Sequence, residues 1–334
     1  MMLLAAVLIA AGALDQSRID CDAVLLADGR VLVAGGSLTA RQVEIFDPRT
    51  GTAVLAGTTP LPMTRTRLAT LHDGRVLITG GGYQTDGRIG FGNFGDRFIG
   101  IADASGNVVP AGMLQEWREA HTATLLRDGR VLIAGGQVVN LGGFHIYRTV
   151  SGSAEIYDPQ TQTTRAIPMT TRRVDHTATL LADGRVLIAG GSDGESVLRS
   201  AEIFDPQSET FTPLFMLAEH QHHTATLLQD GRVLIAGESA EIFDPATLEF
   251  TPAAGLGYHR DHTATLLADG KVLIAGGGAV LYDPVRDEVV ETFPFERSKH
   301  AAVLLRDGSV LFVGGGTTEV LRYFHKVRRR AARK

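Results

Sequence analysis

The sequence lacks several features that would define a protein class at once. It has a single cysteine, Cys21, so it forms no internal disulfide and no metal site made of several cysteines. Aromatic residues make up only 6% of the chain, with one tryptophan. No apolar run approaches the roughly 18 residues that a membrane-spanning helix needs. These absences exclude a disulfide scaffold and an internal transmembrane helix.

Glycine, by contrast, is abundant. The 334 residues contain 39 glycines and 12 prolines, a glycine share well above the usual ~7%. Because no Gly-X-Y period is present, the excess indicates many turns rather than a collagen helix. A hydrophobic share of 44% with a net charge of −5 excludes intrinsic disorder.

One motif accounts for many of these glycines. Its clearest form, HTATLLADGRVLIAGG, contains an Asp-Gly pair, and successive pairs lie 38 to 55 residues apart. The seven copies begin at Cys21, Arg67, His121, His176, His223, His262 and His300. Self-similarity at this period indicates an array of supersecondary units that pack against one another.

Each copy predicts four short antiparallel strands, called A to D from the inside outward. In the third copy, strands A and B (121–126 and 130–136) flank the Asp-Gly pair, which favours a hairpin because a type I′ turn needs positive φ. Strand C (154–159) ends in Asp-Pro, a turn signal, and strand D is weaker. Small residues in strand A and large ones in strand C fit a wedge that narrows toward an axis. The sequence therefore predicts an all-β, seven-bladed β-propeller.

The repeat resembles that of the Kelch family over nearly the whole chain. The resemblance rests on the Gly-Gly pair after strand B, the Tyr-Asp-Pro type of strand C and an Arg or His three residues before strand A. Those basic residues are Arg118, Arg173, His259 and Arg297. Kelch repeats usually carry Trp in strand D, where this chain has Phe211 and Phe250. The resemblance implies the galactose oxidase central-domain-like fold.

The two ends of the chain need separate interpretations. Residues 1–325 are expected to form one propeller, in which the apolar segment Leu3–Ala10 supplies the missing last D strand and closes the ring. The alternative is a secretory signal in residues 1–13, although no basic segment precedes it. The protein would be cytoplasmic in the first case and secreted or periplasmic in the second. Residues 326–334 form a basic tail, expected to be solvated, with a membrane or nucleic-acid tether as the alternative.

Strand polarity predicts which face of the ring could bind a ligand. The A–B and C–D turns share one face, and the B–C and D–A connections share the other. Only the B–C connections vary strongly in length, with long loops at about 82–97 and 137–153. Because loops on rigid scaffolds often carry function, these loops favour recognition over a purely covering role.

The candidate ligand-binding residues are aromatic, basic or both, as in many binding hot spots. They are Tyr83, Arg88, Phe91, Phe94, Arg97, Trp117, Arg118, Phe144, His145, Tyr147, Arg148, Tyr258 and His259. Trp117 is expected in a loop between the two long ones. This composition predicts a platform for a protein segment or a glycan, on a monomer with no nucleic-acid partner and no transmembrane span.

Two sets of repeated polar residues are interpreted as structural. The histidine that opens strand A occurs in five of the seven copies and never twice in one blade. Such residues are too widely spread for one metal ion, so each is expected to bond neighbouring backbone. The strand-C carboxylates Glu44, Glu155, Glu202 and Glu241 are expected to pair with Arg30, Arg130, Arg185 and Arg232. The cluster His220, His222 and His223 lacks a carboxylate or Cys spaced to complete a metal site.

Two enzymatic alternatives remain. Copper radical oxidases of the galactose oxidase type, which share the fold, join a Cys at the start of an inner strand to a Tyr of the next blade. Cys21 has the Cys-like position, but Thr66-Arg67 stands where the Tyr is needed, so no copper and no other cofactor is expected. A carbohydrate-active epimerase or lyase would need a polar cluster at the channel mouth. Its candidates are Arg118, His145, Tyr258 and His259.

Overall fold

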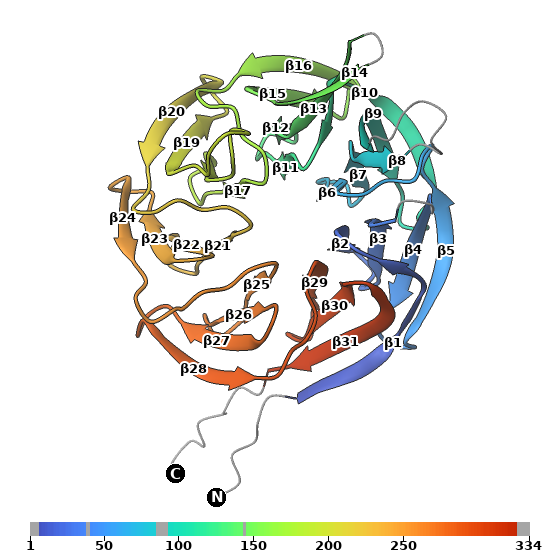
Figure 1. Ribbon diagram of the computed structural model, residues 1–334. Coiled ribbons are helices and arrows are strands. Elements are labelled where there is room, and N and C mark those ends of the chain that lie inside the picture. Colours follow the sequence, from blue (N-terminus) through green and yellow to red (C-terminus); the bar gives the residue numbers. More distant parts are fainter. Residues whose placement is uncertain (1–6, 38–40, 85–92, 143–144, 326–334) are drawn as a thin grey trace, which may run out of the picture.

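Seven β-sheets surround a central channel like the blades of a propeller (Figure 1). This computed structural model describes residues 7–37, 41–84, 93–142 and 145–325. Those residues form no helix, and hence none that is long and apolar enough to cross a membrane. The blades consist of four antiparallel strands each, with strand A beside the channel, so the predicted seven-bladed all-β fold is confirmed.

The blades follow one another in chain order. Blade one contains β2 (Cys21–Leu25), β3 (Val31–Gly35), β4 (Gln42–Asp47) and β5 (Thr52–Thr58). Blade two contains β6 (Arg67–Thr70), β7 (Val76–Thr79), β9 (Asn93–Ala102) and β10 (Val108–Glu119). Blade three contains β11 (Thr122–Leu125), β12 (Val131–Ala134), β15 (Ser153–Asp158) and β16 (Thr163–Pro168). Blade four contains β17 (Thr177–Leu180), β18 (Val186–Ala189), β19 (Ser200–Asp205) and β20 (Thr210–Phe215).

The remaining three blades repeat this pattern. Blade five contains β21 (Thr224–Leu227), β22 (Val233–Ala236), β23 (Ala240–Asp244) and β24 (Glu249–Pro252). Blade six contains β25 (Thr263–Leu266), β26 (Val272–Ala275), β27 (Ala279–Asp283) and β28 (Glu288–Phe293). Blade seven contains β29 (His300–Leu304), β30 (Val310–Gly314), β31 (Thr317–Phe324) and, outermost, β1 (Val7–Arg18).

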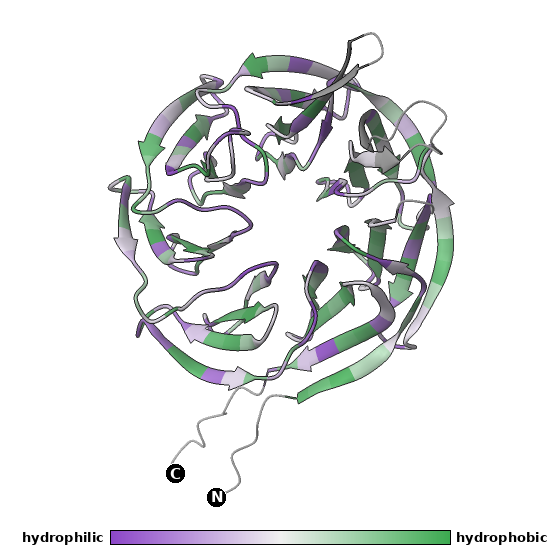
Figure 2. Ribbon diagram, in the orientation of Figure 1, coloured by the Kyte–Doolittle hydropathy of each residue, from purple (hydrophilic) through white to green (hydrophobic). Residues whose placement is uncertain are grey.

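The hydrophobic core lies between the blades. In blade three all four residues of β12 are buried, because strand B packs against a neighbouring blade on each side. One core cluster joins Leu132 and Ile156 of blade three to Ile188 and Phe204 of blade four. Figure 2 shows the matching apolar colour on the middle strands. No blade therefore completes its core without both neighbours.

The Asp-Gly turns join strands A and B as predicted, but they are not type I′ turns, because at all seven turns the glycine has a positive φ and the aspartate does not. In blade three the Leu126 N–H donates to Arg130 O at 2.8 Å, and Gly129 has a φ of 90°. Asp128 accepts bonds from both the backbone and the guanidinium of Arg130. The aspartate of the turn therefore binds the arginine that follows the turn glycine.

The predicted pairing of the strand-C carboxylates was wrong. Arg30, Arg130, Arg185 and Arg232 each bind the aspartate of their own turn. The glutamates instead bind the basic residue three positions before strand A, which enters from the D–A connection of the preceding blade. These pairs are Arg18–Glu44 at 2.7 Å, Arg118–Glu155 and Arg173–Glu202 at 2.9 Å, and His220–Glu241 at 2.6 Å. They are buried and link consecutive blades.

The N-terminal segment closes the ring. Strand β1 pairs antiparallel with β31, with Val7 opposite Phe324 and Ala13 opposite Glu319. It begins at Val7 and continues to Arg18, beyond the predicted end at Ala10, because Leu14 is buried in the core and Arg18 binds Glu44 of blade one. Residues 1–6 and the predicted basic tail 326–334 lie outside the described residues.

Removal of residues 1–13 should destabilise the propeller because it takes away the first half of β1. We expect Tm to fall by several degrees, since a loss of ~1 kcal/mol lowers Tm by about 2–4 °C in larger domains. Removal of residues 1–6 is the control and should leave Tm unchanged. Equal Tm values for both truncations, measured by calorimetry, would contradict a closing role and favour a cleaved leader.

Arg173→Met should be strongly destabilising because it leaves Glu202 buried without its partner. We expect the free energy of unfolding in urea to fall by about 3–5 kcal/mol. The neighbouring Arg172 forms an exposed pair with Glu195, so Arg172→Ala should cost less than about 1 kcal/mol. Similar losses for both variants would show that the buried pair has no special role.

Candidate functional site

The two long B–C connections meet in one extended sheet on the face shared with the D–A connections. Strand β8 (Gly82–Gln84) pairs with the start of β9, and β13 (Gln137–Gly142) pairs with both β14 (His145–Val150) and the end of β10. The strand order is β14-β13-β10-β9-β7-β6. Figure 1 shows both hairpins beside blades two and three. The loops are therefore neighbours, as predicted.

Most aromatic candidates lie on these hairpins. Tyr83 is on β8, Phe94 on β9, and His145 and Tyr147 on β14, where Arg148 is exposed. Candidates Arg88, Phe91 and Phe144 lie outside the described residues. In the β8–β9 ladder Tyr83 lies opposite Phe94.

Trp117 lies on a strand, not in the predicted loop. It is half-buried near the end of β10, between the two hairpins in the sheet. The strand continues this far because β13 gives its last residues a partner. The backbone of Trp117 is thus fixed in the sheet, and its side chain is partly exposed to solvent.

Two candidates prove to be structural. Arg118 is fully buried: it binds Glu155 and donates to Gly135 O at 2.7 Å, so it offers nothing to a ligand. The Arg97 Nε donates to Leu114 O at 2.5 Å. Arg199, at the same position of blade four, makes the same bond to Met216 O at 2.7 Å. Because Arg97 has the same position in blade two as Arg199 has in blade four, alignment of the repeats could have identified it as a residue that stabilises the blade.

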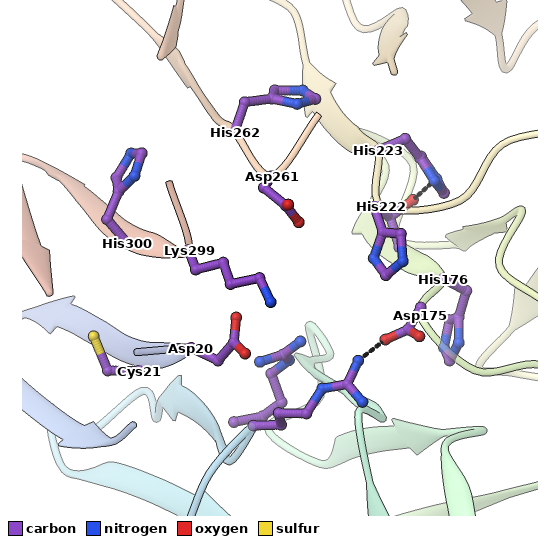
Figure 3. A pocket seen from close by; sticks show the side chains of 13 residues that line it. Asp20, Cys21, Asp175, His176, His222, His223, Asp261, His262, Lys299 and His300 are labelled. Atoms are coloured by element: carbon purple, nitrogen blue, oxygen red, sulfur yellow. Dashed lines mark hydrogen bonds and ion pairs between the residues drawn. The ribbon is translucent and has the colours of Figure 1, made fainter. Parts of the chain in front are cut away.

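The sequence reasoning missed a ring of residues at the channel mouth. The residue immediately before each strand-A opening has a left-handed backbone, with φ between 48° and 56°; in blade two the equivalent opening position is Thr66, one residue before the predicted Arg67. The seven residues are Asp20, Arg65, Ala120, Asp175, His222, Asp261 and Lys299. Figure 3 shows their labelled side chains directed into the mouth, whereas His262 and His300 point away from it. These residues could have been found from the sequence, because the residue type varies at this one position of an otherwise regular repeat.

The mouth is a polar funnel. Six of these seven residues line a cavity of about 260 Å³, the exception being Ala120. Arg65 of blade two and Asp175 of blade four form an ion pair across the position of Ala120, whose side chain is too short to separate them. Asp20, Asp261 and Lys299 lie around the rest of the rim (Figure 3). The funnel therefore presents both acidic and basic groups within one small opening.

The strand-A histidines have a structural role, but with a different partner from the one predicted. Their Nε2 atoms bond threonine hydroxyls of the preceding blade at 2.9–3.1 Å, not the backbone. The pairs are His121–Thr79, His176–Thr122, His223–Thr177, His262–Thr224 and His300–Thr263. Burial lowers the pKa of His223 and His300 to about 3 and that of His262 to about 4. These rings are neutral at pH 7 and join the inner strands.

The residues at the mouth do not fit a copper radical site. Burial raises the pKa of the Cys21 thiol to about 12, and its Sγ lies 3.8 Å from Val313 O. The equivalent position of the next blade is Thr66, whose hydroxyl donates to Thr79 O. No tyrosine lines either channel cavity among the described residues, and no group of three His, Cys, Asp or Glu there is arranged to hold a metal. No reaction step through copper follows from this arrangement.

Comparison with known proteins supports the fold and leaves the chemistry open. A family model described as the Kelch motif matches residues 173–214, which span blade four. No curated protein matches the sequence. A solved fungal alcohol oxidase of the AA5 family, in complex with copper, is similar with a TM-score of 0.72 and 16% identity, over 95% of this chain and 75% of the oxidase. At this identity the likeness shows the architecture alone.

Acid should destabilise the propeller through its histidine ring. Unfolded histidines take up a proton near pH 6.5, whereas folded His223, His262 and His300 stay neutral down to about pH 3–4. The unfolded chain therefore binds more protons, and stability falls as pH drops from 6.5 toward 4. Each histidine contributes a slope of up to about 1.4 kcal/mol per pH unit.

This slope can be measured by urea unfolding at pH 7, 6 and 5. His300→Gln should reduce the slope of the unfolding free energy against pH by the contribution of one histidine, up to about 1.4 kcal/mol per pH unit. The exposed His72 provides the control, His72→Gln. An unchanged slope in His300→Gln would contradict the neutral ring.

Proposed function

We propose that this seven-bladed Kelch β-propeller is a binding platform that recognises a protein segment or a glycan on the face of its B–C and D–A connections. The observation that carries the proposal is the asymmetry of that face. Two consecutive blades extend their B–C connections as hairpins, and both hairpins join β10 in one sheet. Blades five and six turn from strand B to strand C within three residues, Gly237–Ser239 and Gly276–Gly278.

The extended sheet and the polar funnel suit two parts of one ligand. The hairpin strands include the aromatic residues Tyr83, Phe94 and Tyr147, and aromatic residues are common in binding hot spots. The funnel beside them offers Asp20, Asp261 and Lys299 as donors and acceptors. A segment that lies across the hairpins and inserts a polar end into the mouth would use both surfaces.

Trp117 is the favoured anchor of this platform. Partly buried aromatic residues at the centre of an interface dominate hot spots, because they bring a large rigid surface to the contact. Trp117 is half-buried on the strand that the two hairpins share. Its backbone is held by the blade, so truncation of its side chain should affect contact more than fold.

The epimerase or lyase alternative receives less support. Its described candidates do not converge at the mouth: Arg118, on β10 of blade two, is buried against Glu155 of blade three, while Tyr258 and His259 line a cavity of blade six. Copper oxidase chemistry is disfavoured by the residues around Cys21. Recognition therefore accounts best for the described surface.

A ligand can be identified by glycan array and by pull-down with mass spectrometry. With that ligand, Trp117→Ala should weaken binding by about 2 kcal/mol or more, roughly thirtyfold. Arg148→Ala should weaken it less and in a salt-dependent manner, since rim charges act mainly through steering. Unchanged affinity in Trp117→Ala, with an unchanged Tm, would place the site elsewhere.

Arg97 and Arg199 provide a matched pair of controls. Arg97 donates to a carbonyl on strand D of its blade and Arg199 to the carbonyl just after strand D of its own, so Arg97→Ala and Arg199→Ala remove equivalent internal bonds. Only Arg97 adjoins the hairpins. Arg199→Ala should leave affinity unchanged, and any additional loss in Arg97→Ala measures the contribution of the hairpin sector.

A further inference from the structure

Blade six departs from the inter-blade pairing of its neighbours. In blade five His220 is buried, and its Nε2 lies 2.6 Å from Glu241 Oε1. His259 has the same place in blade six, but Val280 stands where the glutamate would be. Blade six thus keeps the basic residue of the pair and lacks the carboxylate.

The orientation of the histidine is retained despite this loss. The ring centroids of His220 and His223 lie 5.5 Å apart at 57°, and those of His259 and His262 lie 5.7 Å apart at 56°. His259 is half-buried instead of buried. Its ring is therefore held in the position that binds a carboxylate in blade five, with one side open to solvent.

A cavity of about 580 Å³ lies over this histidine. Its floor is the turn Gly276–Gly278, and a Cβ added at Gly277 or Gly278 would meet nothing within 4 Å. The exposed Tyr258 and the half-buried Phe293 form two of its walls. Phe293 is fixed by stacking on Tyr323, with centroids 5.3 Å apart. This volume is ample for a small ligand with a ring.

We propose that this cavity binds a small organic acid whose carboxylate takes the place of the missing glutamate beside His259. The exposed guanidinium of Arg260 at the cavity rim adds the positive charge that the anion needs. The ring of the acid lies against Tyr258 and Phe293. This site is separate from the platform, which lies across the channel at blades two and three (Figure 1).

In blade five a side chain and a backbone N–H both bind the carboxylate, but blade six offers only the side-chain donor. In blade five the Leu217 N–H donates to the second oxygen of Glu241 at 2.9 Å. The corresponding N–H of blade six, on Leu256, donates to Ala253 O instead. Binding must therefore depend on His259 and Arg260, which makes both residues sensitive test positions.

The test compares an acid with its neutral isostere on the intact protein. Phenylacetate and phenylacetamide are titrated while the ring resonances of the histidines are followed by NMR. We expect phenylacetate to shift the His259 resonances and to bind at least about tenfold more tightly than the amide, since a bond to a charged group contributes ~1.5 kcal/mol or more. Equal binding of the two probes, or no shift at His259, would overturn the proposal.

Three variants locate the site. His259→Gln and Arg260→Ala should each weaken phenylacetate binding at least about tenfold, whereas His72→Gln, at an exposed turn of blade two, should not. Val280→Glu restores the carboxylate of blade five, so it should abolish phenylacetate binding and raise Tm. Retained binding in a folded Val280→Glu protein would contradict the proposal, and the His259→Gln result decides the matter if that variant does not fold.

Discussion

A buried carboxylate holds each of four blades to the connection that precedes it, and the rest of the ring depends on this contact. In blade four one oxygen of Glu202 accepts from Arg173 Nε at 2.9 Å, and the other accepts from the Thr170 backbone at 2.9 Å. The glutamate therefore fixes both a side chain and a backbone segment of the D–A connection. Such pairs add little net stability over apolar residues, but they are costly to break and they define one geometry.

The position of the channel mouth follows from that geometry. Three residues after Arg173 the chain enters strand A at His176, and the left-handed residue Asp175 between them is directed into the funnel. The basic residue recurs in six blades and the histidine in five, whereas the residue just before the histidine position differs widely in type from blade to blade. Constant and variable positions thus alternate within a few residues, which is how a regular ring can present an irregular surface.

The sequence was sufficient for the number of blades, the hairpins and the proximity of the two long loops, because Asp-Gly turns, strand lengths and chain order are local signals. It did not identify the partner of Glu155, since Arg118 and Arg130 recur with equal regularity. Strand register decides between them: Glu155 lies opposite Ile133, two positions along β12 from Val131, whereas Arg130 stays at the turn beside Asp128. The strand character of Trp117 depended on a non-local partner, β13, and so was beyond local reasoning.

The pairing of β1 with β31 also sets an order of events during synthesis. Val7 emerges from the ribosome early, and its partner Phe324 emerges only after the six other blades have been made. Until then blades one and six each present an uncovered face, and β1 has no strand to pair with. Ring closure is therefore a late step of high contact order, the kind that is slow and prone to intermolecular strand pairing. Nascent chains of this propeller should depend on chaperones most at the moment when the seventh blade forms.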